Sequence, residues 1–179
     1  MPLRRSVALM AAATLFIGDS SPSFDRDFVY RRLLGQWAGS LTYKDYQRPD
    51  RLVTLPTLLD AKFEKDPTAI RLVFTYDDGP GKTIYSHNRF AFDSGGTALA
   101  WDDTAAVNPE SFTITEYRLD SASGFIYLVA ETEGEDDHAP ATLKKAFAIG
   151  SDSLRIVKTV RPKGGEFGFR NEYVFRRVR

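Results

Sequence analysis

From about residue 36 onwards, apolar and polar residues alternate along the chain with a period of two. This alternation is typical of β-strands that turn one face to a core and the other to solvent. The alternating runs are short, and turn-forming sequences such as residues 77–81 and 93–96 separate them. The pattern predicts ten strands, which cover residues 36–46, 51–63, 68–77, 83–92, 97–102, 111–120, 124–133, 142–150, 153–161 and 167–177.

A short helix is predicted before the first strand, over Phe24 to Leu34, and Gly35 ends it. No long helical pattern falls between the strands, so the fold class is all-β and antiparallel. Ten strands joined by short turns would leave two exposed edges in an open sheet, and closure into a barrel removes both. We therefore expect one domain over residues 24–179, a single antiparallel up-and-down β-barrel, with a Greek-key sandwich as the alternative.

The first twenty residues follow a different pattern. Arg4 and Arg5 precede an uninterrupted run of apolar or small residues over positions 7–18. This run is too short to cross a bilayer core, which needs about 20 residues, but it fits the apolar region of a secretory signal peptide. We expect residues 1–20 to be a signal peptide and the mature protein to be periplasmic or secreted, without a transmembrane segment. A buried N-terminal helix is the alternative.

Composition excludes several classes of function. The 179 residues include 24 Lys and Arg against 24 Asp and Glu, whereas a general nucleic-acid binder needs a surplus of positive charge. The chain has no cysteine and two histidines, so disulfides, thiolate zinc sites, iron–sulfur clusters and a His-rich metal centre are excluded. We expect no metal, no cofactor and no nucleic-acid partner.

One short motif indicates a family. Gly35-Gln36-Trp37 opens the first strand directly after the short helix, and a Gly-x-Trp in this place resembles the lipocalins and the wider calycin barrels. Bacterial lipocalin-like domains without disulfides are the nearest likeness. The resemblance implies that Trp37 closes the base of the barrel and stacks against an arginine of the last strand, Arg176 or Arg177, with Arg177 favoured.

Strand alternation also predicts which side chains face the barrel interior. The first half of the chain supplies apolar and aromatic faces. In the second half the faces that begin with Phe112, Phe125 and Leu143 also carry charged residues, which would then point inward. The predicted ligand-binding residues, which we expect to converge on one cavity, are Tyr43, Phe74, Asn88, Phe90, Trp101, Glu116, Arg118, Tyr127, Glu131, Lys145 and Tyr173.

An apolar cavity with a few polar groups is the usual form of a small-molecule site. We expect the barrel to bind a small apolar or amphipathic molecule whose polar end rests on Arg118 or Lys145. Two alternatives remain: an enzyme of the lyase, isomerase or cyclase type that uses lumen carboxylates and tyrosines, and a sealed structural or interaction barrel. A single bulge between residues 111 and 133 would turn Glu116, Arg118 and Glu131 to solvent together. No residue is singled out as catalytic.

Overall fold

The computed structural model describes residues 24–179 except 46, 49 and 104–109, so the predicted signal peptide lies outside the described residues. Within these ranges the chain forms one helix and ten strands. Their bounds are α1 (Arg26–Leu33), β1 (Gly35–Lys44), β2 (Leu52–Phe63), β3 (Ala69–Asp77), β4 (Thr83–Phe92), β5 (Ala98–Asp103), β6 (Ser111–Leu119), β7 (Ile126–Asp136), β8 (Ala139–Ile149), β9 (Ser153–Pro162) and β10 (Gly168–Arg177).

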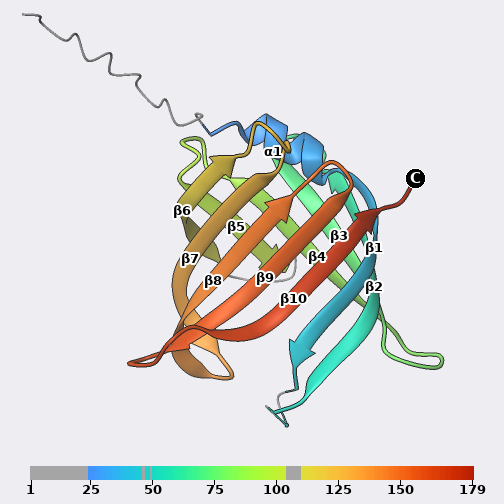
Figure 1. Cartoon of the computed structure of the whole chain (residues 1–179), viewed down its shortest axis with the longest axis vertical. Helices are drawn as coiled ribbons and strands as arrows, with labels where there is room; N and C mark the ends of the chain where they lie inside the picture. Colours follow the sequence, from blue (N-terminus) through green and yellow to red (C-terminus); the bar gives the residue numbers. More distant parts are fainter. Residues whose placement is uncertain (1–23, 46, 49, 104–109) are drawn as a thin grey trace, which may run out of the picture.

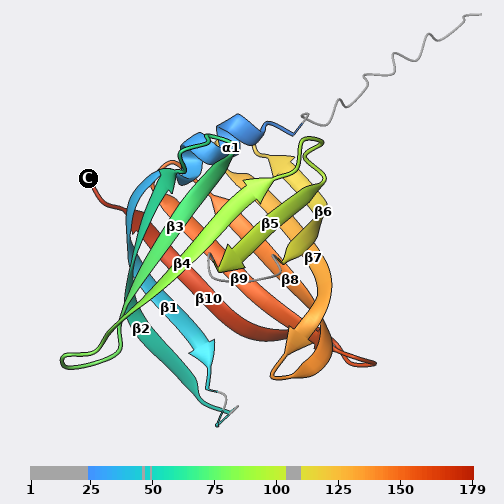
Figure 2. The same cartoon turned by 180° about the vertical axis from the view of Figure 1, so that it is seen from behind.

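The strands form one closed antiparallel barrel. Each strand pairs with the next along the chain, and β1 pairs with β10 to close the sheet. This order confirms the up-and-down barrel and rules out the Greek-key alternative. Helix α1 lies across one end, and the β1–β2, β3–β4 and β9–β10 hairpins extend from the other (Figures 1 and 2). We call these the α1 end and the hairpin end.

The β7–β8 hairpin is longer than the sequence predicts. The polar stretch 134–141 was expected as a loop, but β7 continues to Asp136 and β8 begins at Ala139. The two residues between them, Asp137 and His138, have φ angles of 51° and 61°. Positive φ at both positions is the geometry of a tight two-residue hairpin turn, for which Asn-Gly is the usual sequence signal.

Helix α1 plugs its end of the barrel. It begins at the Asp25 cap, whose carboxylate accepts the Phe28 amide at 2.9 Å. Its inward face buries Val29, Tyr30 and Leu33 in the core. The Tyr30 hydroxyl donates to the carbonyl of Thr68 at 2.7 Å and accepts the amide of Phe92 at 3.0 Å. One side chain therefore ties α1 both to the β2–β3 turn and to β4.

Trp37 lies directly under α1 and is fully buried. Its indole nitrogen donates to the carbonyl of Leu33 at 2.9 Å, and the Arg177 guanidinium lies over its ring, 4.1 Å from the ring centre. The predicted contact between Trp37 and Arg177 is therefore confirmed. Arg177 also donates to the carbonyls of Ser151 and Arg32, both at 2.7 Å, so it joins β10 to the end of α1 and to the β8–β9 turn.

Gly35 is required where α1 passes into β1. Its φ is 118°, a value that side-chain-bearing residues rarely adopt. A Cβ at this position would lie 2.7 Å from Nη1 of Arg177. The glycine of the Gly-x-Trp motif thus leaves room for the arginine that covers the tryptophan.

Candidate functional site

Seven of the predicted ligand-binding residues lie on inward faces of the barrel. They share their strand faces with the hydrophobic core or line the cavity described below. These residues are Tyr43, Phe74, Asn88, Phe90, Trp101, Lys145 and Tyr173.

The predicted orientation of Glu116 and Arg118 is wrong. The register between β6 and β7 shifts between Ile114 and Glu116, so Thr115 is an extra residue in β6. Beyond it, each side chain of β6 points to the face opposite to the one that strict alternation predicts. Tyr117 and Leu119 pack against the core instead, while Glu116 and Arg118 are exposed on the outer wall.

The predicted orientation of Tyr127 and Glu131 is also wrong, for a different reason. Strand β7 is apolar on both faces, and Ile126, Leu128 and Ala130 are the residues that are buried. Tyr127 lies outside under the Arg118 guanidinium, which is 4.0 Å from its ring centre. Glu131 lies on the same wall and pairs with Lys144 at 2.9 Å. The predicted cavity therefore does not include these four residues.

Aromatic rings fill the middle of the barrel. The Trp101 ring centre is 6.0 Å from that of Phe90 and 5.8 Å from that of Phe147. Phe74 lies 5.0 Å from Tyr173 and 6.3 Å from Trp101. The ammonium group of Lys145, a buried residue, lies 4.2 Å from the Trp101 ring, a favourable cation–π distance. These side chains form a packed core, so a ligand has to bind elsewhere in the barrel.

Space remains at the hairpin end. A cavity of about 240 Å³ is lined by Leu41, Tyr43, Leu55, Tyr76, Ile84, Arg170 and Asn171. We call it the hairpin-end cavity. Leu41, Leu55 and Ile84 supply an apolar wall, and the other four residues supply polar groups. Of the residues predicted from sequence, Tyr43 lines this cavity. Tyr173 does not line it but contacts the lining residue Tyr76 through its hydroxyl group.

Sequence reasoning missed Arg170 because of a second irregularity in the sheet. The register between β9 and β10 shifts between Phe169 and Asn171, which leaves Arg170 as the extra residue. Its guanidinium donates to the Lys44 carbonyl and to the Asp136 carboxylate, both at 3.2 Å. Strict alternation along β10 would have placed Arg170 outside, and no turn residue marks the bulge.

A shared carboxylate organises the charges beside this cavity. Asp136 lies 3.2 Å from Nε of Arg170 and 3.6 Å from Nζ of Lys158. Lys158 stands opposite Asn171, a lining residue, in the β9–β10 ladder. The acidic stretch 134–138, which could suggest a cation site, thus uses its most buried carboxylate to hold two positive side chains.

Two tyrosine hydroxyls meet at the base of the cavity. The oxygens of Tyr76, on β3, and Tyr173, on β10, are 2.9 Å apart. Burial raises the pKa of Tyr76, while hydrogen bonds from Tyr173 and Ser86 act in the opposite direction. The pKa of Tyr173 lies well above its usual value, mainly because of burial and also because of Tyr76 beside it. Both phenols therefore stay neutral at physiological pH.

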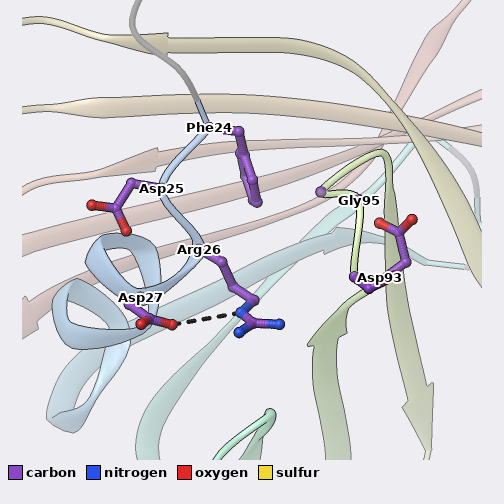
Figure 3. Close-up of a pocket in the computed structure, with 8 residues that line it drawn as sticks. Phe24, Asp25, Arg26, Asp27, Asp93 and Gly95 are labelled. Atoms are coloured by element: carbon purple, nitrogen blue, oxygen red, sulfur yellow. Dashed lines mark ion pairs between the residues drawn. The ribbon is translucent and has the colours of Figure 1, made fainter.

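A different pocket lies at the α1 end, where the start of the helix faces the β4–β5 turn (Figure 3). Its carboxylates already have structural roles. Asp25 caps α1, Asp27 pairs with Arg26 at 3.5 Å, and Asp93 accepts the amides of Thr97 and Ala98 within its own turn. These contacts account for the three carboxylates of this pocket, so we place the candidate site at the hairpin end.

Two solved structures share this architecture. Rv2717c from M. tuberculosis is 15% identical, with a TM-score of 0.59 over 84% of this chain and 96% of its own. The S-type phycobiliprotein lyase CPES from Guillardia theta is 10% identical, with a TM-score of 0.57 over 88% of this chain and 94% of its own. The likeness covers most of the barrel and fits a coarse, calycin-like fold. At these identities the likeness concerns the fold alone.

Comparison with protein-family models gives no match, and neither does comparison with curated proteins. Among the described residues, no helix has the length and apolar character needed to cross a membrane.

Proposed function

We propose that this chain is an exported lipocalin-like protein that binds a small apolar or amphipathic molecule in the hairpin-end cavity. The observation that carries the proposal is the composition of that cavity. Three branched apolar side chains face a set of polar groups across about 240 Å³, the combination that small-molecule sites use for affinity and orientation.

The corrected strand faces favour binding over the proposed enzyme alternative. That alternative relied on Glu116 and Glu131 as lumen carboxylates, and both lie on the outer wall. The sealed-barrel alternative describes the packed middle of the lumen well but leaves the hairpin-end cavity unexplained. We also propose that Gly35, Trp37 and Arg177 relate the chain to bacterial lipocalin-like domains, because their contacts match what that resemblance implies.

A matched pair of substitutions on β2 tests the proposal. Leu55→Trp fills the cavity, whereas Leu58→Trp places the same side chain on the outer wall, where Leu58 is 56% exposed. Protein purified under native conditions from its own source is analysed by native mass spectrometry for a co-purifying small molecule. Titration calorimetry with 3-phenylpropan-1-ol, a compact amphipathic probe, follows on the same variants.

We expect wild type and Leu58→Trp to bind and Leu55→Trp to lose binding. Equal binding by the two tryptophan variants would place the site elsewhere. Absence of both a co-purifying molecule and probe binding from wild type would contradict the proposal.

A further inference from the structure

Two hydrogen bonds lie on the inner surface of the barrel between the packed core and the hairpin-end cavity. The Asn88 side-chain amide donates to the Ser86 hydroxyl at 2.7 Å. Further along the same inner surface, the hydroxyl oxygens of Tyr76 and Tyr173 are 2.9 Å apart. Tyr76 is the member of this pair that lines the cavity. The direction of the hydrogen bonds therefore decides what the cavity offers to a ligand.

The surroundings of Tyr173 fix the direction of the tyrosine pair. Its ring packs between Phe74 and Phe175, with ring centres 5.0 and 5.8 Å away. Among the described residues, Tyr76 is the one hydrogen-bond partner of its hydroxyl. If Tyr76 donated, the Tyr173 proton would be buried without an acceptor, which costs about 1–3 kcal/mol. Tyr173 is therefore the donor and Tyr76 the acceptor.

This direction leaves the hydroxyl proton of Tyr76 unused. A hydroxyl has two lone pairs and one proton. One of the lone pairs of Tyr76 accepts from Tyr173. The proton of Tyr76 is then available to a ligand in the cavity, which Tyr76 lines. The hydrogen bond that Tyr76 accepts from Tyr173 strengthens the one that Tyr76 donates. Tyr76 can therefore donate to an acceptor oxygen of a ligand.

The charges on the same side of the cavity favour an acceptor that is negative. Arg170 lines the cavity, and both Arg170 and Lys158 form ion pairs with the Asp136 carboxylate. These three groups together carry a formal charge of one positive unit. Hydrogen bonds to an ionised acceptor are shorter and about twice as strong as those between neutral groups.

The size of the cavity limits the rest of the ligand. Pockets for drug-sized molecules begin at about 300 Å³, and this cavity holds about 240 Å³. The wall of Leu41, Leu55 and Ile84 fits an apolar body of one ring or a short chain.

We propose that Tyr76 is the specificity-determining residue of the hairpin-end cavity and that it selects a compact molecule with an apolar body and a carboxylate end. This inference rests on the proposed binding function. It adds the chemical class of the ligand and names the residue that recognises the ligand. Tyr173 acts through Tyr76 as a positioning residue.

Three probes of nearly the same size separate the head groups. They are 3-phenylpropionate, 3-phenylpropan-1-ol and 3-phenylpropylamine, titrated calorimetrically into the full chain at neutral pH. We expect wild type to bind the carboxylate at least tenfold more tightly than the alcohol, and the alcohol more tightly than the amine. Tyr76→Phe should weaken carboxylate binding about tenfold, a change of ~1.4 kcal/mol. It should weaken alcohol binding less, because a hydrogen bond to a neutral acceptor is weaker.

Two further variants complete the experiment. Tyr85→Phe is the matched control, because Tyr85 is 61% exposed on the outer wall, and it should bind all three probes like wild type. Tyr173→Phe removes the donor to Tyr76 and so weakens the hydrogen bond that Tyr76 donates, which should reduce the preference for the carboxylate over the alcohol. This change in selectivity, together with the preference of wild type, tests the inference even if Tyr76→Phe fails to fold.

The outcomes separate the two proposals. Equal binding of carboxylate and alcohol by wild type, or unchanged selectivity in a folded Tyr76→Phe variant, would overturn the role of Tyr76 and leave the binding function standing. Failure of wild type to bind any of the three probes would overturn both.

Discussion

The Arg177 guanidinium covers the indole of Trp37 at 4.1 Å while it donates to carbonyls at the end of α1. Trp37 in turn donates to Leu33 within that helix. The two residues thus act as one unit that fastens the first strand, the last strand and the helix together. This unit packs the α1 end of the barrel, and the proposed ligand site lies at the opposite end.

Trp37→Ala should lower the free energy of unfolding by ~3–5 kcal/mol, the usual effect of deleting a large buried aromatic side chain. Arg177→Met should lower it by ~1–2 kcal/mol, since it removes the cation from the ring and leaves much of the side-chain volume. Arg176→Met is the matched control on the same strand; its side chain is 75% exposed, so a change within about 0.5 kcal/mol is expected. Urea denaturation measures all three, and an unchanged midpoint for Trp37→Ala would refute the role assigned to this pair.

Arg118→Met should leave ligand affinity unchanged. The β6 bulge places Arg118 on the outer wall over Tyr127, away from the hairpin-end cavity. The expected loss of stability is about 0.5–1 kcal/mol, the value of an exposed cation–π contact. Titration with 3-phenylpropionate checks the affinity; a tenfold loss would mean that the ligand binds on the outer wall after all.

Stability should fall above about pH 10, and the tyrosine pair should contribute to the fall. Burial raises the pKa of Tyr76 and Tyr173 in the folded state, while unfolded tyrosines titrate near 10. Above that value the unfolded chain releases protons that the folded chain keeps, so unfolding becomes easier as pH rises. The measurement is the unfolding free energy against pH for wild type and Tyr173→Phe. The variant should show a shallower alkaline decline, and parallel curves would contradict the prediction.

His138→Gly should stabilise the barrel by roughly 1 kcal/mol. His138 has a φ of 61°, and a left-handed conformation costs a side-chain-bearing residue about 1–2 kcal/mol. Ala139→Gly serves as the control, because Ala139 is the first residue of β8, and glycine destabilises a strand. Thermal unfolding of the two variants should shift in opposite directions; a lower melting temperature for His138→Gly would show that the imidazole has a role in the turn.

The mature protein should begin between Thr14 and Arg26. The apolar run over residues 7–18 has the length of a signal peptide, and the first element of the barrel starts only at Arg26. N-terminal sequencing of protein from its native source tests this prediction. A chain that still starts at Met1 or Pro2 would contradict the proposed export.

Strand alternation predicted the fold because most strands have one clearly apolar face. β3, for example, buries Ile70, Leu72, Phe74 and Tyr76 in strict alternation. The same rule failed on β7, where Tyr127 and Val129 alternate with Leu128 and Ala130, so that neither face is clearly polar. The neighbouring strand β8 determines which face of β7 points inward, because Leu128 lies opposite Phe147, whose ring packs into the core.

The site was harder to predict than the fold because bulges set it. One extra residue in β6 turned Glu116 and Arg118 outward, and the irregularity in β10 brought Arg170 to the cavity. Neither position has a glycine or proline to mark it. The meeting of Tyr76 and Tyr173 depends on the diameter of the closed barrel, which no local pattern encodes.

The contact between Arg177 and the Leu34 carbonyl joins residues that are 143 positions apart. Closing so long a loop costs more conformational entropy than any single hairpin in the meander. We therefore expect the hairpins to form early and the β1–β10 seam to form last, with folding on the slow timescale of domains dominated by non-local pairing. Until that seam closes, the apolar lining of the barrel is open to solvent, and this is the stage at which the chain most needs protection from aggregation.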